Sequence, residues 1–222
     1  MFEKEIRAKL LERGAAIVGF CKLDFAPVKE LNDHVYCASI CVKLSDSVLK
    51  TITDRPSISY FQHYRTLNAR LDQLALDAVN FIEEKGYGAF PIAASQSVPG
   101  NPYFGIFQHK TAARLSGVGY IGKNDLLITE RFGSKIRLAT VLTNMPLKRD
   151  MPILRCGCGS CKACFNVCPV GAISGEEFNE EHMGEPLIDV EKCSLHMKTY
   201  KDVGRGSVCG LCIKACPKNK LF

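Results

Sequence analysis

Eight of the twelve cysteines lie within the last 65 residues of the chain. The first four of them, Cys158, Cys161, Cys164 and Cys168, are followed by Pro169 and have the C-x2-C-x2-C-x3-C-P spacing of bacterial ferredoxins. Gaps of two residues fold the backbone around a cube, so that successive thiolates reach different irons. This run therefore predicts ligands of a [4Fe-4S] cluster.

A second cysteine run is incomplete. Cys209, Cys212 and Cys216 precede a proline, but Gly206 occupies the position of the leading cysteine, and Cys193 is the only cysteine between the runs. In two-cluster ferredoxins the fourth cysteine of each run ligates the other cluster. The spacing therefore assigns one cluster to Cys158, Cys161, Cys164 and Cys216, and the other to Cys168, Cys193, Cys209 and Cys212.

Two other uses of these cysteines were weighed. Structural zinc sites also contain C-x2-C pairs, but zinc ribbons rarely combine three closely spaced cysteines with C-P. A disulfide framework is typical of small secreted domains, whereas 222 residues can bury a core of their own. Cys156 is left as a spare thiol beside the first run, and Cys21, Cys37 and Cys41 are predicted to be buried small apolar residues.

The net charge of +6 raises the question of nucleic-acid binding. Two clusters with their thiolates carry about −4 in the oxidised form, which lowers the net charge to about +2. The basic residues are dispersed, so charge alone does not indicate a nucleic-acid surface. Residues 1–20 show no signal pattern and no apolar stretch is long enough to span a membrane, so a cytoplasmic location is expected.

The N-terminal part alternates helical and strand patterns. Phe2, Ile6 and Leu10 predict a helix that ends at Gly14, and a longer apolar stripe predicts a helix over about 59–85. Strands are expected over 15–21, 35–44 and 88–93, a loop over 97–105, a short helix over 106–115, a strand over 125–129, and a hairpin that turns at Gly133-Ser134 and returns over 135–143. We expect an α/β or α+β domain over 1–150, and a loop-rich cluster domain over 151–222.

The segment from Gly117 to Asn124 contains the letters G-x-G-x-x-G of a dinucleotide site. That motif should follow a strand and open a helix, whereas this segment follows a predicted helix and leads into a strand. No acidic residue between Glu130 and Asp150 could bind the ribose. Nicotinamide cofactor binding is therefore not expected here.

The stretch HKTAARLSGVGYIGKNDLLITERFGSKIRLATVLTNMPL over 109–147, together with the cysteine runs, resembles epoxyqueuosine reductase, a member of the reductive dehalogenase-like superfamily. The interrupted second run fits that family better than a free-standing ferredoxin. The resemblance implies an α+β fold, with an α/β sandwich-type domain of the reductive dehalogenase/nitroreductase kind and a C-terminal two-cluster ferredoxin-like domain.

The resemblance also implies a cobalamin reduced through the clusters by an external donor of the ferredoxin or flavodoxin type. The positions that match the family's corrinoid contacts are Asn124, Leu127, Leu138, Ser194, Gly210 and Leu211. Leu127 and Leu138 could equally be core strand residues, and Gly210 could serve cluster folding alone. The substrate would be a small molecule of unknown identity.

This sequence departs from the family in one important position. The family's proton-donating aspartate, in an Asp-Ser-Ala-Pro motif, is replaced by the stretch Ile92-Ala-Ala-Ser-Gln96, and no carboxylate lies between Glu84 and Asp125. Tyr60, His63, Tyr103 and His109 could supply a proton, but no catalytic residue is assigned.

Two functions from different classes remain open at this point. The first is a corrinoid-dependent iron-sulfur reductase, and the second is a two-cluster electron-transfer protein that docks on a partner enzyme. The chain resembles a shortened homologue, without helical repeats that could grip tRNA, so tRNA is not expected as a partner. A second copy could supply missing walls in a homodimer.

Overall fold

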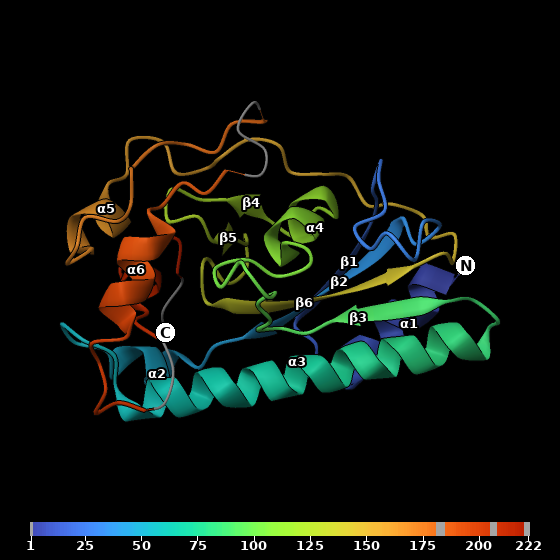
Figure 1. Ribbon diagram of the computed structural model, residues 1–222, viewed down its shortest axis with the longest axis horizontal. Helices are drawn as coiled ribbons and strands as arrows, with labels where there is room; N and C mark the ends of the chain where they lie inside the picture. The colour runs from blue at the N-terminus through green and yellow to red at the C-terminus, as the bar shows by residue number, and fades with distance from the viewer. Residues whose placement is uncertain (1, 181–184, 205–207, 220–222) are drawn as a thin grey trace. The chain divides into compact units, whose positions relative to one another are not determined.

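The computed structural model describes residues 2–180, 185–204 and 208–219, which form a mixture of helices and strands (Figure 1). The chain divides into two compact units. The sheet unit comprises Met1–Lys43, Thr66–Gly119 and Arg137–Leu154, and the cysteine unit comprises Leu44–Arg65, Tyr120–Ile136 and Arg155–Phe222. Each unit is described separately below.

The sheet unit is built on a four-stranded sheet with strand order β1-β2-β6-β3. Its strands are β1 (Ile17–Lys22), β2 (Tyr36–Lys43), β3 (Ala89–Ile92) and β6 (Ile136–Thr143). β1 and β2 are antiparallel with Ile17 opposite Cys41, and β3 and β6 are antiparallel with Ala89 opposite Thr143. The first three of these strands confirm the strands predicted over 15–21, 35–44 and 88–93.

Helices α1 (Phe2–Glu12) and α3 (Ile58–Glu84) confirm the two long helical predictions. Each is followed within two residues by a glycine with positive φ, Gly14 at +93° and Gly86 at +83°, as expected for a helix C-terminus. The short helix α4 (His109–Leu115) begins three residues later than predicted. Among the described residues, no helix combines the length and the apolar composition needed to cross a membrane.

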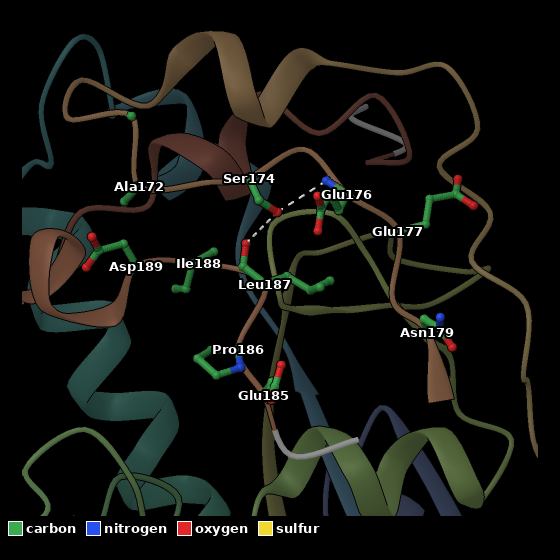
Figure 2. A pocket seen from close by; sticks show the side chains of 11 residues that line it. Ala172, Ser174, Glu176, Glu177, Asn179, Glu185, Pro186, Leu187, Ile188 and Asp189 are labelled. Atoms are coloured by element: carbon green, nitrogen blue, oxygen red, sulfur yellow. Dashed lines mark hydrogen bonds between the residues drawn. The ribbon is translucent and has the colours of Figure 1, made fainter. Parts of the chain in front are cut away.

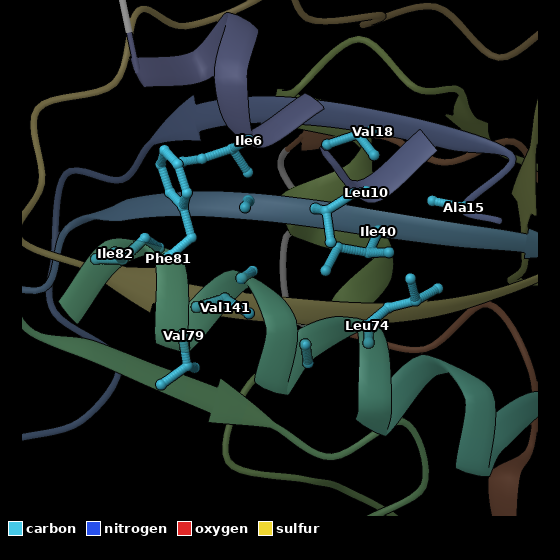
Figure 3. Packing of buried hydrophobic residues seen from close by; sticks show 14 of the residues in the cluster. Ile6, Leu10, Ala15, Val18, Ile40, Leu74, Val79, Phe81, Ile82 and Val141 are labelled. Atoms are coloured by element: carbon cyan, nitrogen blue, oxygen red, sulfur yellow. The ribbon is translucent and has the colours of Figure 1, made fainter. Parts of the chain in front are cut away.

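The core of the sheet unit forms where the apolar stripes of α1 and α3 meet side chains of the sheet (Figure 3). Ile6 and Leu10 come from α1, Leu74 and Ile82 from α3, and Ile40 from β2, and each is at most 1% exposed. The helical spacing of the apolar residues places them on one face, which explains why the two patterns predicted from sequence end in one core.

The cysteine unit has shorter elements. They are α2 (Asp46–Lys50), β4 (Tyr120–Ile121), β5 (Leu127–Ile128), α5 (Ala163–Val167), α6 (Val190–Met197) and α7 (Leu211–Lys214). Side-chain caps begin two of the helices, because Ser45 Oγ accepts from Val48 N and Asp189 Oδ1 accepts from Lys192 N. β4 and β5 form a two-stranded antiparallel sheet, so the glycine segment opens no helix.

The predicted hairpin at Gly133-Ser134 is wrong. Only an isolated bridge joins Thr129 to Gly133, and β6 continues into the main sheet between β2 and β3. A Cβ on Gly133 would lie 2.6 Å from the Lys218 carbonyl, and Ser134 N donates to Asn219 Oδ1 over 2.9 Å. The turn is therefore held both by Thr129 and by a long-range partner at the C-terminal end of the chain.

The division into units differs from a single boundary near residue 150. Segments 44–65 and 120–136 belong with the C-terminal cysteines. One reason is a buried ion pair, in which Lys135 Nζ, only 1% exposed, donates to Asp46. The division into domains over 1–150 and 151–222 stays a prediction. The boundary between the two units that lies nearest to residue 150 is the one between Leu154 and Arg155.

Three cysteines of the sheet unit are buried, as predicted. Cys21 of β1 lies directly opposite Cys37 of β2, and both side chains are at most 2% exposed. A hydrogen bond of the Cys37 thiol to Cys21, followed by burial, raises the pKa of Cys37, and burial alone raises that of Cys41. The thiols of Cys37 and Cys41 therefore stay protonated, and all three side chains pack as small apolar groups.

Substitution Leu74→Ala should destabilise the protein by about 2–5 kcal/mol, because it leaves a cavity in the core of the sheet unit. The matched control is Leu76→Ala on the same helix, where the side chain is 54% exposed and the expected change is within about 0.5 kcal/mol. Urea unfolding monitored by circular dichroism measures both. Equal losses in the two variants would contradict the assigned core face of α3.

Candidate iron-sulfur centre

Four cysteines of the cysteine unit line one small cavity, and we call them the cavity group: Cys158, Cys161, Cys164 and Cys216. Cys158 and Cys161 come from the loop before α5 and Cys164 from α5 itself, and Cys216 follows α7, a helix that contacts α5. The rest of the wall includes Lys123, Asn124 and Lys218. The structure thus brings together the four residues that the sequence assigns to one cluster.

The surroundings of the cavity group act on its sulfurs in both directions. Backbone amides act on three of the sulfurs: that of Lys123 on Cys158, that of Phe165 on Cys164 and that of Lys218 on Cys216. Burial raises the pKa of Cys164 and Cys216, and the amide hydrogen bonds oppose it. A hydrogen bond from Cys156 lowers the pKa of Cys158. Two lysines in the wall also compensate negative charge.

The other four cysteines, which we call the helix group, are Cys168, Cys193, Cys209 and Cys212. Burial raises the pKa of Cys193, and the negative charges of Cys209 and Cys168 raise it further. Burial also raises the pKa of Cys212. The negative charges of the other three members of the group and of Cys164 raise it further. The amide of Ala172 donates to the Cys168 sulfur over 3.3 Å. These thiols therefore lie close enough to repel one another as thiolates.

Both groups fit the thiolate donor set of a [4Fe-4S] cluster, which takes four cysteines with amide donors at the sulfurs. Within residues 2–180, 185–204 and 208–219, no three His, Cys, Asp or Glu side chains are arranged to hold a single metal ion. Gly206, the residue in place of the leading cysteine, lies outside the described residues. The individual ligand assignments stay predictions.

Five of the six predicted corrinoid contacts belong to the cysteine unit: Asn124, Leu127, Ser194, Gly210 and Leu211. Asn124 lines the cysteine cavity, and its Oδ1 accepts from Leu126 N over 3.3 Å. Leu127 and Leu211 are buried by the protein itself, with only 3% and 4% of their surface exposed. Ser194 lies on α6 beside Cys193, and its side chain is half-buried.

Gly210 occupies a position that requires glycine for reasons internal to the protein. Its φ is +81°, and a Cβ would lie 2.7 Å from the Tyr60 ring. The sixth position, Leu138, lies half-buried on β6 in the sheet unit. The described residues therefore give Leu127, Gly210 and Leu211 packing partners of their own, and corrinoid contact at all six positions stays a prediction.

The stretch that replaces the family's acidic motif is held by a polar network in the sheet unit. His109 contacts the Ala93 carbonyl through Nε2 at 3.0 Å and Thr140 Oγ1 through Nδ1 at 2.9 Å. Asp72 Oδ1 accepts from Ala94 N over 2.8 Å. Asp72 comes from α3 and so lies outside the stretch from Glu84 to Asp125 that contains no carboxylate, and only its place on the polar side of that helix could indicate it from sequence.

The other proton-donor candidates have different surroundings. His63 Nε2 accepts from Ser45 N over 2.9 Å, and burial lowers its pKa. Tyr60 is buried against Gly210, whereas Tyr103 lies in the 97–105 loop with 37% of its surface exposed. His63 and Tyr60 therefore have structural roles in the cysteine unit.

A larger, open pocket lies between residues 171–179 and 185–189 of the cysteine unit (Figure 2). Ser174 Oγ donates to the Leu187 carbonyl and accepts from Glu176 N, which ties the two walls together. Its charged lining is acidic, with Glu176, Glu177, Glu185 and Asp189, and no cysteine lines it. This pocket has no part in the cysteine centre.

Comparison with known proteins agrees with the cysteine chemistry. Residues 157–219 match the family described as a 4Fe-4S double cluster binding domain. This match covers the cysteines of both groups. The spacing, the cavity and the match together define an iron-sulfur protein that carries a double-cluster domain.

Within that class, the chain resembles two kinds of reductase. Epoxyqueuosine reductase of Atelocyanobacterium thalassa (isolate ALOHA) is 37% identical over 121 residues, which cover 53% of this chain and 39% of the relative. Tetrachloroethene reductive dehalogenase of Dehalobacter restrictus is 26% identical over 226 residues, which cover 94% of this chain and 37% of the relative. The chain thus spans less than two fifths of either protein's length.

Solved structures of both kinds share the fold. A reductive dehalogenase structure that suggests a mechanism for B12-dependent dehalogenation has a TM-score of 0.73 at 23% identity, and the match covers 97% of this chain and 31% of that one. Epoxyqueuosine reductase with a modified tRNA stem loop has a TM-score of 0.62 at 20% identity, covering 99% and 65%. The resemblance predicted from sequence is confirmed.

Acidification should weaken the protein partly through His109. Burial lowers the pKa of folded His109 below its ordinary value, so the unfolded chain binds the proton first as the pH falls. The stability that neutral His109 provides is therefore complete above about pH 6.5 and is lost as the pH falls toward the lower folded pKa. Thermal unfolding at about pH 7.5 and about pH 6 should show a smaller drop in Tm for His109→Gln than for wild type. An equal drop in both proteins would exclude this role.

Proposed function

We propose that this protein is an iron-sulfur oxidoreductase that passes electrons through two [4Fe-4S] clusters to a bound corrinoid and a small-molecule substrate. The observation that carries the proposal is the cavity lined by Cys158, Cys161, Cys164 and Cys216, because its members come from both cysteine runs in the predicted exchange. When bound, the clusters supply one-electron storage and relay. The helix group is proposed to hold the second.

The chain's own residues would do three things at the first cluster. Lys123 and Lys218 offset its negative charge, since both line the cavity. The backbone amides at Cys158, Cys164 and Cys216 stabilise the thiolates, and burial limits access of water. These are the protein's means of setting a cluster potential.

The corrinoid part of the proposal is supported by resemblance alone. A reductive dehalogenase of similar fold is associated with B12-dependent chemistry, and the six positions from Asn124 to Leu211 match that family's contacts. We also propose that the domain before the cluster region has an α/β sandwich-type fold of the reductive dehalogenase/nitroreductase kind. Protons for substrate reduction would have to come from a group other than the missing aspartate, and His109 and Asp72 are the candidates at that stretch.

The alternative is an electron-transfer protein that docks on a partner enzyme. It is favoured by Ala93 and Ala94 in place of the acid, and by the packing that already covers Leu127 and Leu211. In either case we propose an external donor of the ferredoxin or flavodoxin type and a cytoplasmic setting, where all twelve cysteines stay reduced as they are in this structure. The described residues give no argument for a tRNA substrate or for a homodimer.

Cysteine substitutions test the cluster assignment. Anaerobically reconstituted wild type should contain about eight irons per chain. Cys158→Ala should lose about one to four of them with the matching visible absorbance, because it removes a thiolate of the cavity group. Cys156→Ala is the matched control, since it removes a neighbouring thiol outside the group, and its iron content should equal that of wild type. The reverse pattern would reassign the ligand to Cys156.

Cobalamin titration separates the two functions. The reductase proposal predicts a saturable change in the corrinoid spectrum when base-off cobalamin binds to the anaerobic, cluster-loaded protein. Asn124→Ala should weaken this binding at least severalfold, whereas Leu76→Ala on the exposed face of α3 should not. No spectral change at any concentration would leave the electron-transfer protein as the function.

A further inference from the structure

The side-chain hydroxyl of Tyr120 is a buried polar group of the cysteine unit. Tyr120 begins β4 in the cysteine unit, and no group in the described part of the chain makes a hydrogen bond of normal geometry with its Oη. Buried tyrosine hydroxyls nearly always have such a partner. The position of this hydroxyl therefore points to a group beyond the amino acids themselves.

The groups that face this hydroxyl are cysteines. The neighbouring groups that act on it are the sulfurs of Cys158, Cys156 and Cys216, and Cys158 is also close enough to interact with the hydroxyl directly. Two of these three belong to the cavity group. A phenol hydroxyl can donate through its O–H and cysteine sulfur can accept, so this hydroxyl is placed to donate to the sulfurs.

The chain beside Cys158 is shaped to admit this ring. A Cβ on Gly157 would lie 2.9 Å from Cε1, Cζ and Oη of Tyr120. Gly157 does not have the positive φ that would by itself favour glycine, so space for the tyrosine is the reason for glycine here. The residue before the first predicted ligand thus positions the hydroxyl end of the ring.

We propose that the Tyr120 hydroxyl donates a hydrogen bond to the sulfur of the cluster held by the cavity group, at Cys158 or at the sulfide beside it. This inference rests on the proposed function, because it requires a cluster at those cysteines. Reduction adds negative charge to a cluster, and a donor at its sulfur stabilises the reduced form. Tyr120 is therefore a positioning and tuning residue that raises the reduction potential of this cluster.

The helix group has a tyrosine in a different situation, which gives a matched control. Burial and then the charge of Cys209 raise the pKa of Tyr200. Its hydroxyl, however, already contacts His196 Nε2 at 2.8 Å. Of the two tyrosine hydroxyls, that of Tyr200 has a side-chain partner and that of Tyr120 makes no hydrogen bond of normal geometry in the described residues. The two clusters are therefore expected to differ in the hydrogen bonds that they accept.

The test is a redox titration of the anaerobic, cluster-loaded protein followed by electron paramagnetic resonance. Tyr120→Phe keeps the ring against Gly157 and removes the donor. The expected result is full iron content, one midpoint potential shifted to a more negative value and the other unchanged. Tyr200→Phe should leave the midpoint of the cavity-group cluster where it is in wild type.

A second variant keeps the hydroxyl. Incorporation of 3-fluorotyrosine at position 120 alone makes the O–H a stronger donor and should shift the same midpoint to a more positive value. This variant decides the question if Tyr120→Phe binds less iron. A midpoint that does not move with either change, or two midpoints that move equally, would overturn the role of Tyr120.

The outcomes also distinguish this inference from the proposed function. If wild type binds about eight irons and Tyr120→Phe binds the same with unchanged midpoints, the clusters stand and the hydrogen bond is refuted. If wild type binds no cluster under reconstitution, the proposed function is refuted, and the inference is refuted with it.

Discussion

Repulsion among closely placed thiolates is the constraint on which the cysteine unit depends. Four sulfurs around one cavity cannot all be ionised in a buried place unless amides, cations or metal offset their charge. The cavity group has amide donors at three sulfurs and two lysines in its wall. Burial pulls in the opposite direction, since it favours neutral thiols. The iron core of the proposed cluster would offset the same negative charge.

Local sequence patterns were sufficient for the elements whose partners lie nearby or whose period is long. The stripe of α3 and the β-branched run of β2 each predicted their own element, because a single buried face defines a helix or a strand. The cysteine spacing likewise predicted which four thiols would meet, since ligand geometry is encoded in gaps of two or three residues.

Features set by distant partners could not be read from the sequence. Gly133-Ser134 has the composition of a hairpin turn, yet Ser134 donates to Asn219, more than eighty residues away, and the flanking segments do not pair as a hairpin. Asp72 reaches the Ala94 amide from α3, and a search along the chain near the missing acid passed it by. Tyr120 looked like part of a glycine loop, and only the burial of its hydroxyl distinguishes it. In each case the information lies in a tertiary contact.

The interleaving of the two units has a consequence for modularity. Because segments 44–65 and 120–136 belong with the cysteines, the C-terminal region is not a cassette that could be excised at residue 150. A fragment that began there would lack Asp46 and Lys135, a buried ion pair, and the Tyr60 ring that fills the space above Gly210. The cysteine centre therefore needs segments from several parts of the chain, whereas a free ferredoxin folds as a separate domain.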